Sequence, residues 1–244
     1  MGKKGGGKGG RRPENGLPQR TDMHVARKVA HCAMATSLAV GLGFLTEGNS
    51  IRLVITGAVV MCSVLEAVRQ HVPLVNGILQ VVLGPLMRSH EVKKTAGTFY
   101  YAVGCWLAVV LFPKPVAVHA LLCLGWVDPV ASVGGILFRS VAPVGNGKSW
   151  CGFALGGLVI GIVGFAYLHY AFPSETTDEL AYVAAVVALF AAFVEAIIPS
   201  PPAGPFPFNT DDNFVIPVAC ALFINIIYGS SGLLGAANSL HLSA

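Results

Sequence analysis

The feature that most constrains this chain is a series of apolar stretches of about 20 residues, which recurs after residue 24. A helix of this length can cross about 30 Å of hydrocarbon. Only 11% of the 244 residues are charged, against about 25% in an ordinary soluble domain, so polar side chains are too few to cover a soluble surface. The sequence therefore predicts an all-α fold, a polytopic bundle of transmembrane helices.

Seven stretches are predicted to span the membrane. They cover residues 25–45, 51–69, 96–112, 115–138, 151–172, 179–198 and 214–237. An eighth apolar stretch, from Pro73 to Met87, is too short to span comfortably, and prolines stand at or near its ends. This pattern favours an interfacial or re-entrant helix. Residues 25–244 are thus expected to form one transmembrane domain.

Residues 1–24 are rich in glycine and basic side chains and nearly free of apolar residues. Such a segment cannot bury enough apolar surface to fold, so we predict a disordered basic tail. The positive-inside rule places the tail in the cytoplasm, where the anionic membrane leaflet is its expected partner. The loops that contain Lys93, Lys148 and Pro202 then also face the cytoplasm. A nucleic-acid partner is not expected for a chain embedded in the membrane.

Ionisable residues gather at the predicted cytoplasmic ends of the helices. All 16 Lys and Arg residues lie at or before Lys148, whereas carboxylates occur in both parts of the chain. A bound anion would therefore be held from the first part, and a metal ion could find ligands in both. Topology bias explains the basic residues but not the carboxylates that share this face, which are Glu66, Glu91, Asp128, Glu195, Asp211 and Asp212.

Asp128 lies deep in an apolar stretch, where a charge costs at least about 2.5–3.5 kcal/mol unless it is paired. Pro129 disfavours helical backbone at the residue before it and suits the first position of a new helix. We therefore predict a broken helix whose second half is capped by Asp128. A capped kink is one interpretation of this pattern, and a Mg²⁺ or phosphate site is the other.

Residues 142–149 approach the pattern of a phosphate-binding loop, but that loop requires a βαβ unit, which the sequence does not predict. We therefore exclude the P-loop fold but expect this loop to bind an anion through the same kinds of contact. Gly145 and Gly147 would let backbone amides approach an anion, and Lys148 would supply a point charge. An ordinary solvated loop is the alternative.

The segment around the last predicted span offers further oxygen ligands. Glu195 precedes a proline-rich turn, and Asp211, Asp212 and Asn213 follow it. Adjacent carboxylates and amides suit a hard cation such as Mg²⁺. Alternatively, these residues only cap the last helix.

The first two spans carry charged residues at helical spacing. Arg27 and His31 are four residues apart and share one helical face, while topology bias alone would explain Arg27 and Lys28. Glu66 and Arg69 are three residues apart. They form either a simple intrahelical ion pair or part of a site, and the sequence does not separate these alternatives.

Two residue types are expected to pack rather than react. The six cysteines are scattered without a CxxC pair or a Cys/His cluster, which argues against a zinc site. Gly152 with Gly156, and Gly157 with Gly161, have the GxxxG spacing that lets a neighbouring helix approach closely.

The candidate residues follow a characteristic order along the chain. The motifs are Arg27-Lys28-x-x-His31, Glu66-x-x-Arg69, Leu86-Met87-Arg88-x-x-Glu91, Gly97-Thr98-x-Tyr100-Tyr101, Trp126-x-Asp128-x-x-Ala131-Ser132, Lys148-Ser149-x-x-Gly152, Glu195 and Asp212-Asn213-x-x-x-Pro217. This order resembles the polyprenol kinase family, which includes dolichol, phytol and farnesol kinases and CTP-dependent diacylglycerol kinases. The likeness covers about residues 25–230 and is greatest to the fungal diacylglycerol kinase branch.

The resemblance implies a CTP-dependent lipid kinase that converts diacylglycerol to phosphatidic acid with a divalent cation, Mg²⁺ or another. It also implies an endoplasmic reticulum membrane and an active site on the cytoplasmic face, so that residues 25–244 form a catalytic domain. The candidate catalytic residues are Asp128, Lys148, Glu66 and His31, among which the general base is open between Asp128, Glu66 and His31. The candidate nucleotide- or phosphate-binding residues are Arg27, Lys28, Arg69, Arg88, Arg139, Lys148, Ser149 and Asn213. The candidate metal ligands are Asp128, Asp211, Asp212 and Glu195.

Three alternatives compete with this hypothesis. A dolichol or phytol kinase would use another lipid alcohol with the same motifs. A CTP:lipid cytidylyltransferase is disfavoured because the Lys-Asp and Gly-His-Gly-Gly signature of those enzymes is not found. A transporter also has broken helices and buried charges, but here the carboxylates lie at one face instead of the midplane, and no inverted repeat is found.

Overall fold

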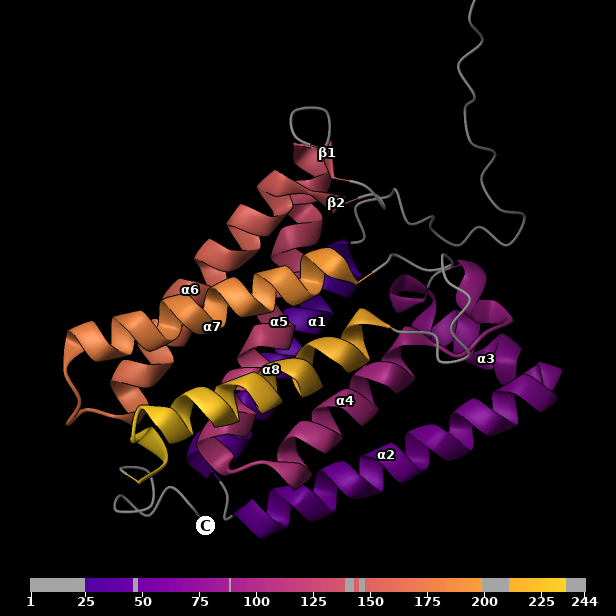
Figure 1. The fold of residues 1–244 in the computed structure, drawn as a ribbon. Helices are drawn as coiled ribbons and strands as arrows, with labels where there is room; N and C mark the ends of the chain where they lie inside the picture. Colours follow the sequence, from indigo (N-terminus) through magenta and orange to yellow (C-terminus); the bar gives the residue numbers. More distant parts are fainter. Residues whose placement is uncertain are drawn as a thin grey trace, which may run out of the picture.

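A computed structural model describes residues 25–45, 48–87, 89–138, 143–144, 148–198 and 211–235, so the predicted tail at residues 1–24 lies outside the described part of the chain. The fold is a bundle of α-helices, which confirms the all-α prediction (Figure 1). The helices are α1 (Val25–Val40), α2 (Gly48–His71), α3 (Pro73–Leu83), α4 (Gly97–Leu111), α5 (Lys114–Leu137), α6 (Trp150–Ala171), α7 (Thr177–Ile197) and α8 (Asp212–Ser230).

In the part of the chain that the structure describes, five helices, α2, α5, α6, α7 and α8, are long and apolar enough to cross a membrane. The other two predicted spans are also helical but shorter. Helix α1 has 16 residues and continues into the five-residue π-helical turn η1 (Gly41–Leu45), and α4 has 15 residues. The multi-pass architecture is therefore confirmed, with two spans near the lower limit of length.

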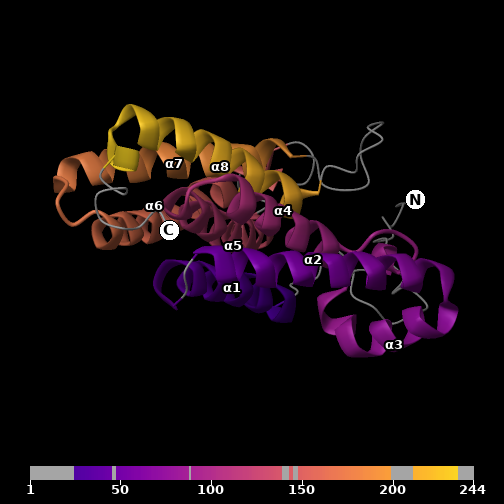
Figure 2. The same cartoon turned by 90° about the horizontal axis from the view of Figure 1, so that it is seen from below.

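The eighth apolar stretch forms the short helix α3, which has 11 residues and packs beside α2 (Figure 2). Pro73 stands at its start, and its last turn passes into a 3₁₀ turn, η2 (Gly84–Leu86). A second 3₁₀ turn, η3 (Ser89–Val92), leads towards α4. At about 1.5 Å per residue, α3 is too short to span, as predicted.

Helix α5 is the centre of the bundle. Figure 2 shows it in a middle layer with α4 and α6, between a layer of α1 and α2 and a layer of α7 and α8. Lipid tails are as apolar as leucine, so close packing rather than removal from water stabilises such contacts. A Cβ at Gly125 would lie 2.6 Å from Ala35 of α1, and one at Gly152 would lie 2.6 Å from the Ala131 carbonyl of α5. For Gly152, a member of the predicted GxxxG pairs, this distance agrees with the expected packing role.

The predicted break at Asp128 is wrong, because α5 continues through Pro129 as one helix. Pro129 cannot donate the hydrogen bond that the Gly125 carbonyl would otherwise accept. One residue earlier in α5, the Leu124 carbonyl oxygen accepts a hydrogen bond from His31 Nε2 of α1 at 3.1 Å. Support from a neighbouring helix is what lets a proline remain inside a membrane helix.

Candidate active site

Ionisable side chains from distant parts of the chain meet at one end of the bundle. The end of α7 and the beginning of α8 lie at this end in Figure 1. The charges of Asp128 and Asp212 both act on His31 and on Glu195, and Arg27 lies within electrostatic range of Asp212. One cluster therefore contains most of the residues that the sequence analysis singled out.

Asp128 and His31 form the inner part of this cluster. His31 Nδ1 lies 3.9 Å from a carboxylate oxygen of Asp128. Its other nitrogen, Nε2, faces the Leu124 carbonyl, which only accepts, so Nε2 carries a hydrogen. The Tyr101 hydroxyl donates to the His31 carbonyl at 3.2 Å, and the two rings meet edge to face at 4.8 Å. His31 is held rigidly, whereas the Asp128 side chain remains 20% exposed.

Arg27 is oriented by two partners from the segment between α3 and α4. Its Nη1 donates to Glu91 Oε1 at 3.0 Å and to the Leu86 carbonyl at 2.8 Å. The Glu91 side chain is only 4% exposed, so this is a nearly buried ion pair. Glu91 stood in a family motif but was not assigned to the site. The sequence signal that could have assigned Glu91 to the site was its spacing from Arg88 in the Arg-x-x-Glu motif. The structure pairs Glu91 with Arg27.

Gly97, at the start of α4, is the second residue that sequence reasoning left without a role. A Cβ at this position would lie 2.6 Å from Arg27 Nη2, 3.1 Å from Glu91 Oε1 and 3.3 Å from Asn213 Nδ2. Asn213 Nδ2 also donates to the Gly97 carbonyl at 3.3 Å. A side chain at this position would therefore displace the Arg27 guanidinium from its place beside Glu91.

The acidic pair at the start of α8 both caps the helix and faces the cluster. Asp211 is the N-cap residue, and its Oδ1 accepts a hydrogen bond from the Asn213 amide at 3.0 Å. Asp212 Oδ1 accepts from the same amide at 3.1 Å, and all three residues are buried. Burial, together with repulsion from Asp212, raises the pKa of Asp211 to about 8. A bound cation would relieve this repulsion, so capping and cation binding are compatible.

Lys148 reaches the cluster from a short ribbon before α6. The strands β1 (Pro143–Val144) and β2 (Lys148–Ser149) pair antiparallel, and Lys148 Nζ forms an ion pair with Glu195 Oε1 of α7. Ser149 is buried and caps α6 by accepting from the Gly152 amide at 3.0 Å. Other predicted members of the site lie outside the described residues, namely Arg88, Arg139, Gly145 and Gly147.

Glu66 and Arg69 form a separate, structural cluster on α2. Arg69 donates to both carboxylate oxygens of Glu66 at 2.7 Å, and its remaining donors reach the Lys94 carbonyl and Asn76 Oδ1. Glu66 Oε1 also accepts from the Ala96 amide at 3.2 Å. Of the two alternatives, the geometry favours an ion pair that holds the segment before Gly97 onto α2.

Comparison with known proteins decides the family. The chain is 31% identical to CTP-dependent diacylglycerol kinase 1 of Eremothecium gossypii, over 86% of this chain and 69% of that protein. The chain belongs to the CTP-dependent diacylglycerol kinase family. Kinases of the same name from Schizosaccharomyces pombe and Saccharomyces cerevisiae are 29% and 25% identical, over 65% and 85% of this chain and 73% and 74% of those proteins. No model of a known protein family and no solved structure matches the chain.

The metal ion implied by the resemblance to this kinase family can be tested against the donor set. Among the residues that the structure describes, no three His, Cys, Asp or Glu side chains converge as a metal cage. Mg²⁺ rarely uses such a cage, because it is usually held by one or two carboxylates together with substrate phosphates. The buried oxygens of Asp211 and Asp212, with Asp128 in the same cluster, fit this mode of binding. Lys28 lies half-buried on α1, and its phosphate-binding role stays a prediction.

Proposed function

We propose that this chain is a CTP-dependent diacylglycerol kinase. It transfers the γ-phosphoryl group of CTP to the free hydroxyl of diacylglycerol and releases CDP and phosphatidic acid. The main support is the meeting of Asp128, Asp212, Arg27 and the Lys148–Glu195 pair at one end of a membrane bundle. The relatives that place the chain in its family carry this activity in their names.

Arg27 and Lys148 are the cations proposed to bind the nucleotide phosphates. Phosphoryl transfer depends on positioning and on stabilising charge over the equatorial oxygens, more than on covalent chemistry. Each cation is already held by a carboxylate, Glu91 or Glu195, and each side chain keeps a small exposed fraction, 14% and 12%. Among the described residues, Arg27 bonds to Glu91 and Leu86 through Nη1 alone, so within this part of the chain Nη2 and Nε remain to donate to a phosphate.

Asp128 is the proposed general base. Glu66 is fully engaged with Arg69 and the Ala96 amide, and His31 directs its one open nitrogen at Asp128. Asp128 is partly exposed and can accept the proton of the lipid hydroxyl as the hydroxyl oxygen attacks phosphorus. His31 lies beside this carboxylate and is assigned no proton-transfer step.

Asp211, Asp212 and Asn213 are the residues proposed to hold a divalent cation. When bound, Mg²⁺ would neutralise the charge that develops on the β and γ phosphates. Their place at the positive end of α8 brings a partial positive charge to the same phosphates. Glu195 is engaged by Lys148, so we assign it first to that ion pair and only second to the metal.

A product assay tests the proposed reaction. Purified protein is given γ-labelled CTP or ATP with diacylglycerol, dolichol or phytol in turn. Label is expected in phosphatidic acid, with CTP preferred, CDP as the second product and diacylglycerol used faster than either polyprenol. Release of pyrophosphate would indicate a cytidylyltransferase. Equal or faster turnover of dolichol or phytol would move the chain to the polyprenol kinase branch, and nucleotide-independent flux into proteoliposomes would indicate a transporter.

We also propose that the site faces the cytoplasm from an endoplasmic reticulum membrane. The basic residues of the chain concentrate at this end, and the basic tail before α1 would bind the anionic leaflet. A glycosylation acceptor inserted beside Lys148 is expected to stay unmodified, and one inserted beside Glu175 to be glycosylated. The reverse pattern would invert the proposed topology.

A further inference from the structure

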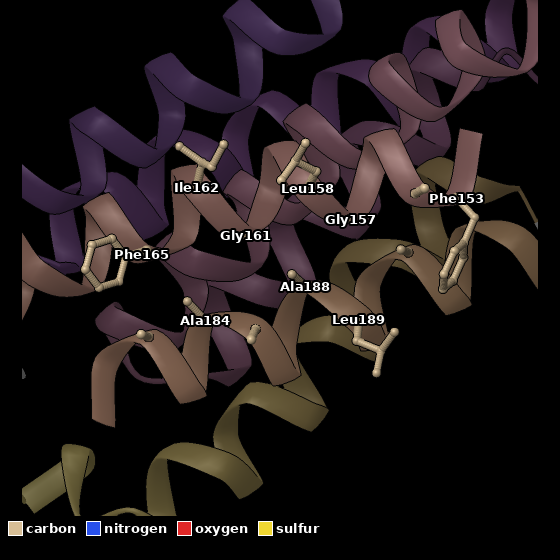
Figure 3. A pocket seen from close by; sticks show the side chains of 13 residues that line it. Phe153, Gly157, Leu158, Gly161, Ile162, Phe165, Ala184, Ala188 and Leu189 are labelled. Carbon is tan, nitrogen blue, oxygen red and sulfur yellow. The ribbon is translucent and has the colours of Figure 1, made fainter. Parts of the chain in front are cut away.

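An apolar groove of about 570 Å³ runs between α6 and α7 (Figure 3). All of the side chains that line it are apolar. Figure 3 shows Phe153 and Phe165 at its two ends, with Leu158, Ile162 and Leu189 along its rim. The groove thus offers a binding surface for hydrocarbon and no group that would recognise a polar ligand.

Small residues form the floor of this groove. A Cβ at Gly157 would lie 3.4 Å from Ala192 of α7, and one at Gly161 would lie 3.5 Å from Ala188. These are ordinary van der Waals distances, so a methyl group would fit at either position and the two glycines leave that space to the groove. The large residues that border them, Leu158 and Leu189, are 60% and 62% exposed and leave the groove open to the lipid.

Exposed aromatic residues indicate the depth of the groove in the membrane. Trp150 begins α6 and Tyr170 lies near its end, and both are exposed, as expected of the aromatic belts at the two membrane interfaces. Twenty residues of helix separate them, or about 30 Å, which equals the thickness of the hydrocarbon core. Phe153 lies one turn below the Trp150 interface, and the groove extends from it by about 18 Å to Phe165, slightly more than one leaflet.

The groove begins beside the candidate active site. Ala192, which lines it, stands three residues before Glu195 on α7, so both lie on nearly the same face within one turn. Glu195 pairs with Lys148, and Phe153 follows Ser149 by four residues. A molecule whose tail lies in the groove would therefore present its polar end to the Lys148–Glu195 pair.

We propose that this groove holds an acyl chain of the diacylglycerol substrate, with the glycerol hydroxyl directed to the phosphoryl-transfer site. The inference rests on the proposed function. Diacylglycerol carries no charged headgroup, so its tails provide nearly all of its binding surface. Binding energy from the non-reacting tails is what can position the hydroxyl for attack.

Filling the groove tests this proposal. Ala185 lines it and is exposed, and Ala185→Leu adds bulk there without entering the core. The matched control is Ala166→Leu, which adds the same bulk to an exposed position of α6 that does not line the groove. In mixed micelles, Ala185→Leu is expected to raise the KM for dioleoylglycerol roughly tenfold more than the KM for dioctanoylglycerol. Ala166→Leu is expected to leave the ratio of the two KM values unchanged. Equal ratios for the two variants would overturn the groove assignment.

Photolabelling gives a readout that does not depend on turnover. Diacylglycerol with a diazirine in one acyl chain is expected to label the peptides of α6 and α7 more strongly than phosphatidylcholine with the same tail. Equal labelling would mean ordinary boundary lipid, and crosslinks between two copies of the chain would mean a protein interface, so either result contradicts the proposal. If selective labelling were accompanied by no phosphatidic acid, the proposed function would fail and the groove would stand. Normal turnover with unselective labelling would reject the groove alone.

Discussion

Replacing Asp128 by asparagine is expected to leave the bundle folded and to lower diacylglycerol phosphorylation by at least about 100-fold. The amide keeps the size of the side chain and can donate to His31 Nδ1, so the contact between α1 and α5 is preserved. It cannot accept the proton of the lipid hydroxyl, because an amide is far less basic than a carboxylate. Turnover with CTP and the midpoint of thermal unfolding in detergent are the two measurements.

Two other variants are the controls for this result. Asp178→Asn removes an exposed carboxylate in the first turn of α7, remote from the proposed site, and should keep normal turnover. Arg69→Met breaks a buried ion pair and should cost about 3–5 kcal/mol of stability, with activity falling only as folded protein is lost. If Asp128→Asn followed the pattern of Arg69→Met, or kept near-normal turnover, Asp128 would be a packing residue.

A magnesium titration separates the two chemical roles considered for Asp128. For a general base, the Asp128→Asn enzyme should lose turnover at every Mg²⁺ concentration and keep the same half-saturating concentration. For a metal ligand, that concentration should rise and added Mg²⁺ should restore part of the turnover. The first pattern is expected, because the partly exposed Asp128 is assigned as the base and the cation is assigned to the acidic pair that caps α8.

The helices were predictable because each is specified by its own local composition. Long apolar runs predict α2 and α5 to α8 directly, and the proline at the start of α3 marks a short helix. The continuity of α5 through Pro129 was not predictable from local rules, which consider only the backbone beside the proline. The hydrogen bond from His31 joins residues 93 positions apart, and no sequence pattern near Asp128 predicts it.

The members of the site were likewise easier to predict than their partners. Buried charges are costly in a membrane, so each charged residue in an apolar stretch is by itself a candidate for the site. Which charges pair with one another depends on tertiary contacts: Arg27 meets Glu91 from 64 residues away, whereas Glu66 meets Arg69 within the same helix. The role of Gly97 was not predictable for the same reason, since it depends on three side chains from other parts of the chain.

Both cations proposed to bind phosphate are paired with a carboxylate inside the bundle. An unpaired ammonium or guanidinium would be costly in this environment, so Glu91 and Glu195 hold Arg27 and Lys148 in place before the nucleotide binds. This arrangement complicates simple mutagenesis. Loss of Lys148 alone would leave Glu195 buried without its partner, and instability would be confused with a loss of catalysis.

Lys148→Met alone is therefore expected to lower both stability and turnover, and the informative comparison is made in a Glu195→Gln background. There the carboxylate is already neutral and Lys148 has lost its charged partner, so adding Lys148→Met should keep or raise the midpoint of unfolding. Turnover should still fall by about 100- to 1,000-fold relative to Glu195→Gln, because a cation that stabilises the transferring phosphoryl group has been removed. If the double variant matched the turnover of Glu195→Gln, the role of Lys148 would be limited to its ion pair, and the phosphate would have to be held by Arg27 and other cations.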